Sequence, residues 1–474
     1  MNKQTADLRS RVSQQSVTPK TLFILIIIVV LIFVRYFLTG LKPVKYHKPD
    51  YFYPQWKKSN LTACGWKVKY DPIIKVTNLT TYMVGSYVEH RQEVKMTRTI
   101  AIVLRSENAE YQCMLCCNGT KVPVSATLNI HSDHFDFEYG TADIMCRIPE
   151  ECPTPEHVAI TFKSPKENGS LQDIHAFQPV RNQQKIHAFQ PVRNQQKQEV
   201  FPYEFTICIS TMYDYENVLL LVQAMEMYRI LGVQKVAIYK TNCSKDTQKV
   251  LDYYVSQDFV ELIPWSVSSY INVSRGWKKQ VSPGELHYFG QIAALNDCLY
   301  RYMYKSHYVA LQDLDEFILP LNLNNWTKLL PELERKHGLQ VGFYFENNVF
   351  PFYLKDPKSE YSPDFWKKVP GENILEYVYR LKNNDESKFS NFKVIVNPRL
   401  VFETSVHGFL KSVKGIQRVN PEVARMYHVK NFIKKDDAFK HNCILRDTHL
   451  RDYADRLIPA VSEVLQKALK LPKV

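Results

Sequence analysis

Several features that would assign this chain to a common class of protein are missing from it. Its 61 lysines and arginines outnumber 48 aspartates and glutamates, giving a formal net charge of +13, yet they form no dense basic tract. Charge spread in this way suits a solvated basic surface or an anionic substrate at least as well as nucleic acid, and we expect no nucleic-acid partner. With 45% hydrophobic residues and 13% aromatic ones, the composition excludes a disordered chain. The 474 residues leave room for more than one domain.

A cleaved signal peptide also finds little support, because no A-x-A-like site follows the one long apolar run near the N-terminus. That run extends without interruption from Leu22 to Val34 and continues through Arg35 to Leu38. A helix of about 17 to 20 residues spans a bilayer. We therefore expect a cytoplasmic tail (1–20), a transmembrane signal anchor (21–39) and a stem (40–60).

The asparagines of N-x-[ST] triplets all follow this run. They are Asn60, Asn78, Asn118, Asn168, Asn242, Asn272 and Asn325. This placement predicts a type II membrane protein whose main part is luminal and N-glycosylated at several of these positions.

The cysteines of the chain also agree with a luminal location, where disulfides form. Six of the ten precede residue 153, including the stretch "CMLCC", but no second C-x-x-C follows at the spacing of a zinc knuckle. We expect disulfides there, and we expect Cys208 and Cys298, which stand in apolar runs, to be buried.

Short alternating segments at 61–170 predict a small β-rich domain. The sequence "IHAFQPVRNQQK" at 174–185 is then repeated without change at 186–197, and we interpret 171–203 as a surface linker. From 204 to 474, strands and helices alternate, which predicts an α/β domain with a mostly parallel central sheet.

Two carboxylates mark the candidate site. Asp313 and Asp315 follow the apolar run "HYVAL" in the chain's single D-x-D triplet. In a doubly wound sheet this is the carboxyl end of a central strand, where ligands bind. Paired carboxylates there suit Mg²⁺ or Mn²⁺, although a solvated turn is the alternative.

The stretch "HYFGQIAALNDCLYRYMYKSHYVALQDLDEFILP" (287–320) closely resembles the core of glycosyltransferase family 92, and the shorter blocks at 394–409 and 424–432 are similar to that family. The resemblance implies a GT-A-like fold, UDP-galactose as donor, a Mn²⁺ cofactor, a Golgi location and β-1,4 transfer with inversion. The implied acceptor is a terminal β-galactose or fucose of a glycoprotein N-glycan.

Carried onto this sequence, the resemblance implies a metal site of Asp313, Asp315 and His428. Donor-binding candidates are Asp313, Glu216 and Gln291, together with His407. Lys430, Lys434 and Lys435 are candidates for contacting the diphosphate, with a solvated charged turn as the alternative.

Inversion requires a general base. Glu403 is the first candidate, followed by Asp364 and Glu346. Trp277, Trp326 and Trp366 are candidates for stacking on a sugar, with a core role as the alternative. Two other functions remain open at this stage: a catalytically silent luminal carbohydrate-binding protein, and the same enzyme with another UDP-sugar.

Overall fold

The structure is a computed structural model that describes residues 62–65, 68–162, 188–340, 342–382, 392–431 and 444–471. Asn60–Val474 forms one compact unit. The predicted tail, anchor and stem lie outside the described residues. Within the described ranges, no helix is long and apolar enough to cross a membrane, so the anchor stays a prediction.

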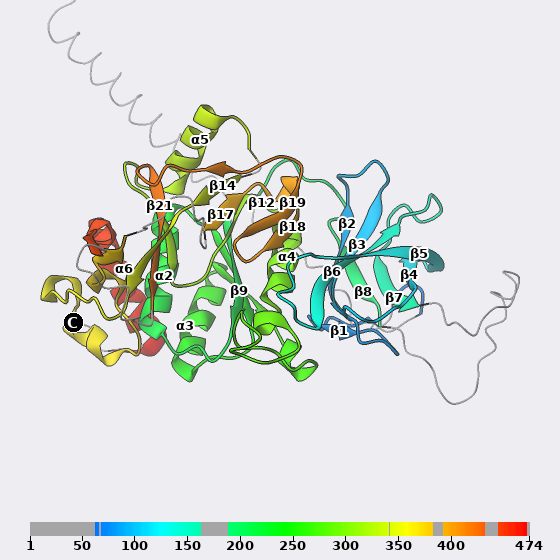
Figure 1. Ribbon diagram of the computed structural model, residues 1–474, viewed down its shortest axis with the longest axis horizontal. Coiled ribbons are helices and arrows are strands. Elements are labelled where there is room, and N and C mark those ends of the chain that lie inside the picture. The colour runs from blue at the N-terminus through cyan, green and yellow to red at the C-terminus, as the bar shows by residue number, and fades with distance from the viewer. Residues whose placement is uncertain are drawn as a thin grey trace, which may run out of the picture. The chain divides into compact units, whose positions relative to one another are not determined.

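The first part of this unit is a closed β-sheet (Figure 1). Its described strands form the order β1-β2-β3-β6-β5-β4-β7-β8, and the sheet closes because β8 also pairs with β2. Disulfides join Cys64 to Cys116, Cys113 to Cys146 and Cys117 to Cys152. They confirm the prediction of disulfides among these six cysteines. The strands are Ile74–Lys75 (β1), Tyr82–Glu89 (β2), Met96–Leu104 (β3), Tyr111–Cys117 (β4), Thr120–Ile130 (β5), Tyr139–Arg147 (β6), His157–Phe162 (β7) and Gln190–Arg193 (β8).

The second copy of the 12-residue repeat belongs to this barrel. It contains β8, and its Phe189 is 1% exposed. We predicted a surface linker at 171–203, but from residue 188 onward the structure has a barrel strand in this range. The first copy of the repeat lies outside the described residues. The strand gave no sequence signal because it is four residues long and contains Pro191, and proline is disfavoured in sheets.

The second part is built on a sheet in the order β11-β10-β9-β12-β17-β14-β20. Strands β11, β10, β9 and β12 are parallel, as predicted, and β17 pairs antiparallel with β12. The strands are Tyr203–Met212 (β9), Lys235–Lys240 (β10), Val260–Pro264 (β11), Ser306–Leu311 (β12), Gly342–Phe345 (β14), Lys393–Val396 (β17) and Gln417–Arg418 (β20).

Smaller sheets and five α-helices complete the described part. A three-stranded sheet has the order β13-β21-β15, and two antiparallel pairs are β16-β22 and β18-β19. The strands are Glu316–Pro320 (β13), Asn347–Pro351 (β15), Tyr379–Leu381 (β16), Val401–Ser405 (β18), Gly408–Ser412 (β19), Ala424–Lys430 (β21) and Ile444–Arg446 (β22). The helices are Val218–Leu231 (α2), Lys245–Ser256 (α3), Gln291–Tyr302 (α4), Trp326–His337 (α5) and Ala454–Leu469 (α6).

Side chains of the central sheet alternate between two cores. On β9, Ile207 and Ile209 pack with α2, α3 and α6, whereas Cys208 packs with α4 and with barrel residues. This period of two follows from the pleat of a strand. Helix α4 is buried along its whole length because the sheet covers one side of it and the barrel strands β2 and β3 contact the other.

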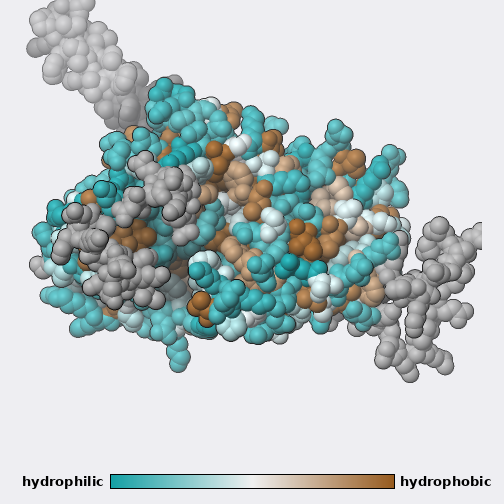
Figure 2. Space-filling view, in the orientation of Figure 1, coloured by the Kyte–Doolittle hydropathy of each residue, from teal (hydrophilic) through white to brown (hydrophobic). Residues whose placement is uncertain are grey.

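The surface in Figure 2 is mostly hydrophilic, with scattered apolar residues. Among the described asparagines of the N-x-[ST] triplets, Asn78, Asn118, Asn242 and Asn272 are exposed. Their exposure agrees with the predicted glycosylation but does not test it. Asn325 begins α5, where its side chain accepts a hydrogen bond from the backbone N–H of Lys328.

Candidate active site

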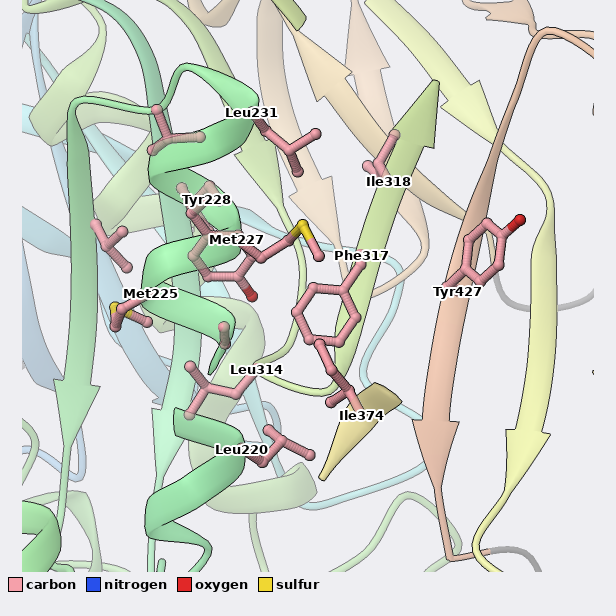
Figure 3. Packing of buried hydrophobic residues seen from close by; sticks show 14 of the residues in the cluster. Leu220, Met225, Met227, Tyr228, Leu231, Leu314, Phe317, Ile318, Ile374 and Tyr427 are labelled. Atoms are coloured by element: carbon pink, nitrogen blue, oxygen red, sulfur yellow. The ribbon is translucent and has the colours of Figure 1, made fainter. Parts of the chain in front are cut away.

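The two aspartates lie on the short loop between β12 and β13. Leu314, between them, is 6% exposed and points into the core beside α2 (Figure 3). The hydroxyl of Tyr228 on α2 also donates to the backbone oxygen of Asp313, at 3.3 Å. With Leu314 anchored inside, the side chains of Asp313 and Asp315 remain 42% and 35% exposed. The loop thus presents both carboxylates toward solvent.

Lys393, the first residue of β17, compensates the charge beneath this loop. Its side chain is 3% exposed, and its Nζ lies 2.9 Å from Asp313 Oδ2 and 3.4 Å from Glu316 Oε2. The protein packed around the Asp313 carboxyl group would by itself raise its pKa, but Lys393, with smaller contributions from His428 and His407, lowers that pKa below its ordinary value. Burial raises the pKa of Glu316, although Lys393 opposes the shift.

His428 on β21 faces the second aspartate. Strand β21 pairs with β13 so that His428 lies opposite Glu316. Its Nε2 is 3.4 Å from Asp315 Oδ2, and its Nδ1 is 3.6 Å from Glu316 Oε1. Burial alone would lower the pKa of His428, but Asp315 and Glu316 together raise it. The structure therefore brings together all three predicted metal ligands.

A divalent metal fits this donor set. Adjacent ligands of an octahedral cation with bonds of about 2.1 Å lie about 3 Å apart, close to the 3.4 Å between Asp315 Oδ2 and His428 Nε2. Carboxylate and imidazole are both ligands of Mn²⁺-like metals. The Nδ1 of His428 is buried and has no hydrogen-bond partner among the described residues, and Glu316 Oε1 lies 3.6 Å from it, on the side of the ring away from Asp315.

Aromatic side chains adjoin the carboxylates on the side of the loop after β9. The ring of Tyr213 stacks on Phe289 at 4.0 Å, and the guanidinium of Arg275 lies 5.3 Å from the Tyr213 ring. Burial raises the pKa of the neighbouring Tyr288, its contact with Tyr213 raises that pKa further, and the charges of the two aspartates add a smaller increase. Tyr288 and Phe289 both have positive φ (38° and 54°), which is strained for residues with a Cβ and is typical of functional sites.

The predicted donor-binding residues are only partly gathered here. Gln291, 5% exposed, lies at the carboxyl end of β9, where the hydroxyl of Ser210 donates to its Oε1 at 3.4 Å. His407 lies in the turn between β18 and β19, and the preceding Val406 accepts a hydrogen bond from Lys393 through its backbone oxygen. Glu216 is exposed before α2. Helix α2 begins after Asn217, whose side chain accepts a hydrogen bond from the backbone N–H of Leu220.

The candidate bases lie in three different surroundings. Glu403 is 8% exposed and accepts a hydrogen bond from Asn129 of the barrel at 2.9 Å. Asp364 is 96% exposed and pairs with Lys367 on the surface. Glu346 joins β14 to β15, beside β21, and lies 3.1 Å from Arg418. None of the three has a described hydrogen bond or ion pair with Asp313, Asp315 or His428.

Glu403 also belongs to a second cluster of possible metal ligands. Ligand atoms of Glu403, His131 and Asp143 lie within 4.8 Å of one another, all buried. However, Asp143 already forms an ion pair with the guanidinium of Arg98, and that cation would repel a metal ion. This cluster therefore suits a metal ion less well than Asp315 and His428 do.

Two of the three tryptophans predicted as candidates for stacking on a sugar are fully buried. Trp326 and Trp366 are 0% and 1% exposed, whereas Trp277 is 59% exposed. Lys434 and Lys435 lie outside the described residues, and Lys430 ends β21.

Sequence reasoning missed two features of the site. Lys393 precedes the apolar residues "VIV"; a lysine at the head of a buried strand needs a nearby carboxylate, and that was the available signal. Cys208 and Cys298, expected to be buried, are also joined by a disulfide. Their luminal context was the available signal.

The model of glycosyltransferase family 92 matches residues 203–463, more than half of the chain. The chain belongs to glycosyltransferase family 92. Two relatives from Caenorhabditis elegans are a glycosyltransferase family 92 protein, 25% identical over 234 residues, and the beta-1,4-galactosyltransferase galt-1, 23% identical over 240 residues. The matches cover 48% and 49% of this family 92 chain but 42% and 49% of those proteins, so it spans less than half of either relative.

Solved structures resemble this family 92 chain only distantly. Staphylococcus aureus TarS is 11% identical with a TM-score of 0.27, and 56% of this chain and 70% of that one are covered. Glucosyl-3-phosphoglycerate synthase from Mycobacterium tuberculosis, crystallised with Mn²⁺ and UDP, is 10% identical with a TM-score of 0.24 and covers 57% and 80%. Scores this low carry no weight for the substrate of the family 92 chain.

Proposed function

We propose that this protein is a metal-dependent, inverting galactosyltransferase of GT-A-like type. It would transfer galactose from UDP-galactose to a terminal β-galactose or fucose of glycoprotein N-glycans, forming a β-1,4 linkage. The observation that carries the proposal is the convergence of Asp313, Asp315 and His428 at the carboxyl end of β12. The beta-1,4-galactosyltransferase activity named for a relative supports the choice of donor and linkage.

In this proposal, Asp315 and His428 would hold Mn²⁺, which would supply positive charge against the diphosphate leaving group. The Tyr213–Phe289 pair and Arg275 lie where the loop after β9 would hold the nucleotide. An acceptor hydroxyl attacks the anomeric carbon as the bond to the diphosphate breaks, and a base of this chain accepts the hydroxyl proton. The anchor at 21–39 would place this site in the Golgi lumen.

A donor panel tests this function. The full-length chain, purified in detergent with Mn²⁺, is given UDP-galactose, UDP-glucose or UDP-GlcNAc with galactose- or fucose-terminated N-glycans. We expect acceptor-dependent UDP release from UDP-galactose and a product one hexose heavier. UDP release from UDP-glucose or UDP-GlcNAc instead would show that the donor is that UDP-sugar and not UDP-galactose. A folded protein that releases no UDP with any donor would contradict the proposal in favour of a carbohydrate-binding protein.

A further inference from the structure

The ammonium group of Lys393 is buried, and it contacts groups of the protein itself. Its Nζ contacts Asp313 and Glu316 and also donates to the backbone oxygen of Val406 at 3.3 Å. With its side chain 3% exposed, the ammonium is enclosed beneath the loop. It is therefore placed to act on the carboxylates and not directly on a diphosphate.

The position of Lys393 bears on the net charge of the site. Asp313, Asp315 and Glu316 are three carboxylates, and Lys393 is the cation closest to two of them. A metal-bound imidazole is neutral, so three negative charges and one positive charge leave a net charge of −2. That value matches one divalent cation.

We propose that Lys393 is a positioning residue that sets the charge of this site for a single divalent metal and keeps Asp313 apart from it. By pairing with Asp313, Lys393 leaves Asp315 and His428 as the side chains that hold the metal. This inference rests on the proposed function, because it concerns the metal of the same site.

The geometry supports a division between the two aspartates. Asp313 Oδ2 is 2.9 Å from Lys393 Nζ, whereas Asp315 Oδ2 is 3.4 Å from His428 Nε2. Glu316, 1% exposed, contacts both Lys393 and His428, and its Oε2 also accepts from the backbone N–H of Asp313 at 2.7 Å. Glu316 thus contacts both the Lys393–Asp313 pair and His428, which faces Asp315.

A charge cycle tests the inference without using activity. Binding of Mn²⁺ alone is measured by electron paramagnetic resonance on the full-length chain in detergent, for wild type, Lys393→Met, Glu316→Gln and the double variant. Removing the lysine takes the site from −2 to −3, removing the glutamate charge takes it to −1, and the double variant restores −2. A unit charge about 6 Å from a divalent cation changes affinity about tenfold in water-like surroundings. We therefore expect about tenfold tighter binding in Lys393→Met, about tenfold weaker binding in Glu316→Gln, and a near wild-type affinity in the double variant.

Other results have distinct meanings. If all three variants bind more weakly, in step with their loss of thermal stability, Lys393 is merely structural and the inference is wrong. If Lys393→Met does not fold, the comparison of Glu316→Gln with the double variant decides, because the inference requires tighter binding in the double. A wild-type chain that is folded and binds no Mn²⁺ would contradict the proposed metal-dependent function itself. Lys367→Met is the matched control, since Lys367 pairs with Asp364 on the surface and its loss should leave the affinity unchanged.

Discussion

At the scale of single residues, chemistry and burial separate candidates that the sequence could not rank. Asp313, Asp315 and His428 were selected by motif and resemblance, and they lie together. Glu403 was selected by analogy with other inverting enzymes and Asp364 as a second candidate, and the structure places Glu403 in a buried polar cluster and Asp364 in solvent. Neither burial nor partners can be read from the chain, because both depend on segments far away in sequence. For example, Glu403 accepts a hydrogen bond from Asn129, which lies in the barrel and is distant in sequence.

Glu403 gives a clear prediction at this scale. Glu403→Gln keeps an oxygen that can accept from Asn129 but removes a buried negative charge that interacts with the guanidinium of Arg98, so we expect a loss of about 1–2 kcal/mol in unfolding free energy with kcat near the wild-type value. Thermal denaturation and UDP release measure the two effects. Removing a general base instead costs about 10²- to 10⁴-fold in rate, and such a loss at unchanged stability would assign the base to Glu403. Asp364→Asn is the exposed control and should change neither quantity.

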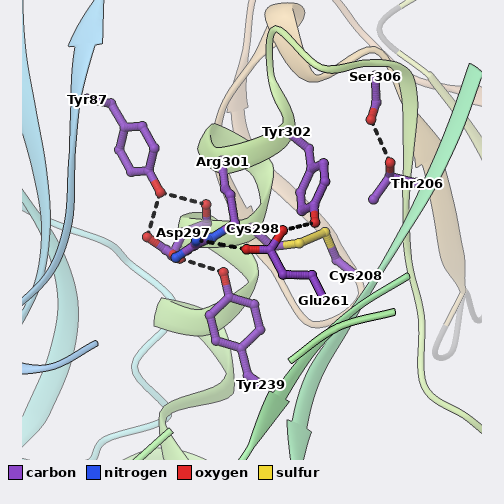
Figure 4. The surroundings of a disulfide bond; sticks show 10 residues. All are labelled: Tyr87, Thr206, Cys208, Tyr239, Glu261, Asp297, Cys298, Arg301, Tyr302 and Ser306. Atoms are coloured by element: carbon purple, nitrogen blue, oxygen red, sulfur yellow. Dashed lines mark hydrogen bonds and ion pairs between the residues drawn. A yellow bond between two sulfur atoms is a disulfide. The ribbon is translucent and has the colours of Figure 1, made fainter. Parts of the chain in front are cut away.

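At the scale of elements, the alternating strands and helices from residue 204 onward were predictable because period and caps are local signals. Gly232, with φ of 97°, ends α2 as its position predicts. Strand β8 and the disulfide between β9 and α4 were not predictable, since each depends on a partner distant in sequence. Figure 4 shows Cys208–Cys298 joining the central sheet to α4, next to the buried Asp297.

This disulfide should stabilise the protein by limiting its unfolded state. It closes a loop with a sequence separation of 90 residues, for which chain entropy predicts about 4.6 kcal/mol. We expect the Cys208→Ser/Cys298→Ser variant to lose much of this free energy of unfolding, measured by chemical denaturation. Cys243→Ser is the control, because Cys243 is free. Equal stability of the double variant and the wild type would show that the bond contributes nothing.

At the scale of the whole molecule, the barrel and the catalytic part share a core although the family match begins at residue 203. The hydroxyl of Tyr87, on β2, donates to Asp297 Oδ1 at 2.6 Å, and the hydroxyl of Tyr239 donates to Oδ2 at 2.5 Å. Arg301 lies 3.0 Å from the same carboxylate (Figure 4). The sequence predicted a β-rich domain before the catalytic one, but it held no sign that α4 would be buried between them.

This contact predicts that the two parts unfold together. Asp297→Ala leaves the Arg301 charge without its closest buried partner, which costs about 3–5 kcal/mol. Tyr87→Phe removes one hydrogen bond and should cost about 1 kcal/mol. We expect a single transition in calorimetry that shifts down in both variants, and more in Asp297→Ala. Two separate transitions, with one insensitive to Asp297, would show that the barrel is independent.

The most direct test of the metal-dependent site is metal removal and return in the wild type and in Asp315→Asn. The full-length chain is stripped with EDTA, Mn²⁺ is added back, and UDP release from UDP-galactose is measured with an N-glycan acceptor. We expect wild-type activity to disappear with EDTA and return with Mn²⁺, whereas Asp315→Asn, folded as well as the wild type, stays inactive at any Mn²⁺ concentration. Activity that survives EDTA, or a fully active Asp315→Asn variant, would contradict the account.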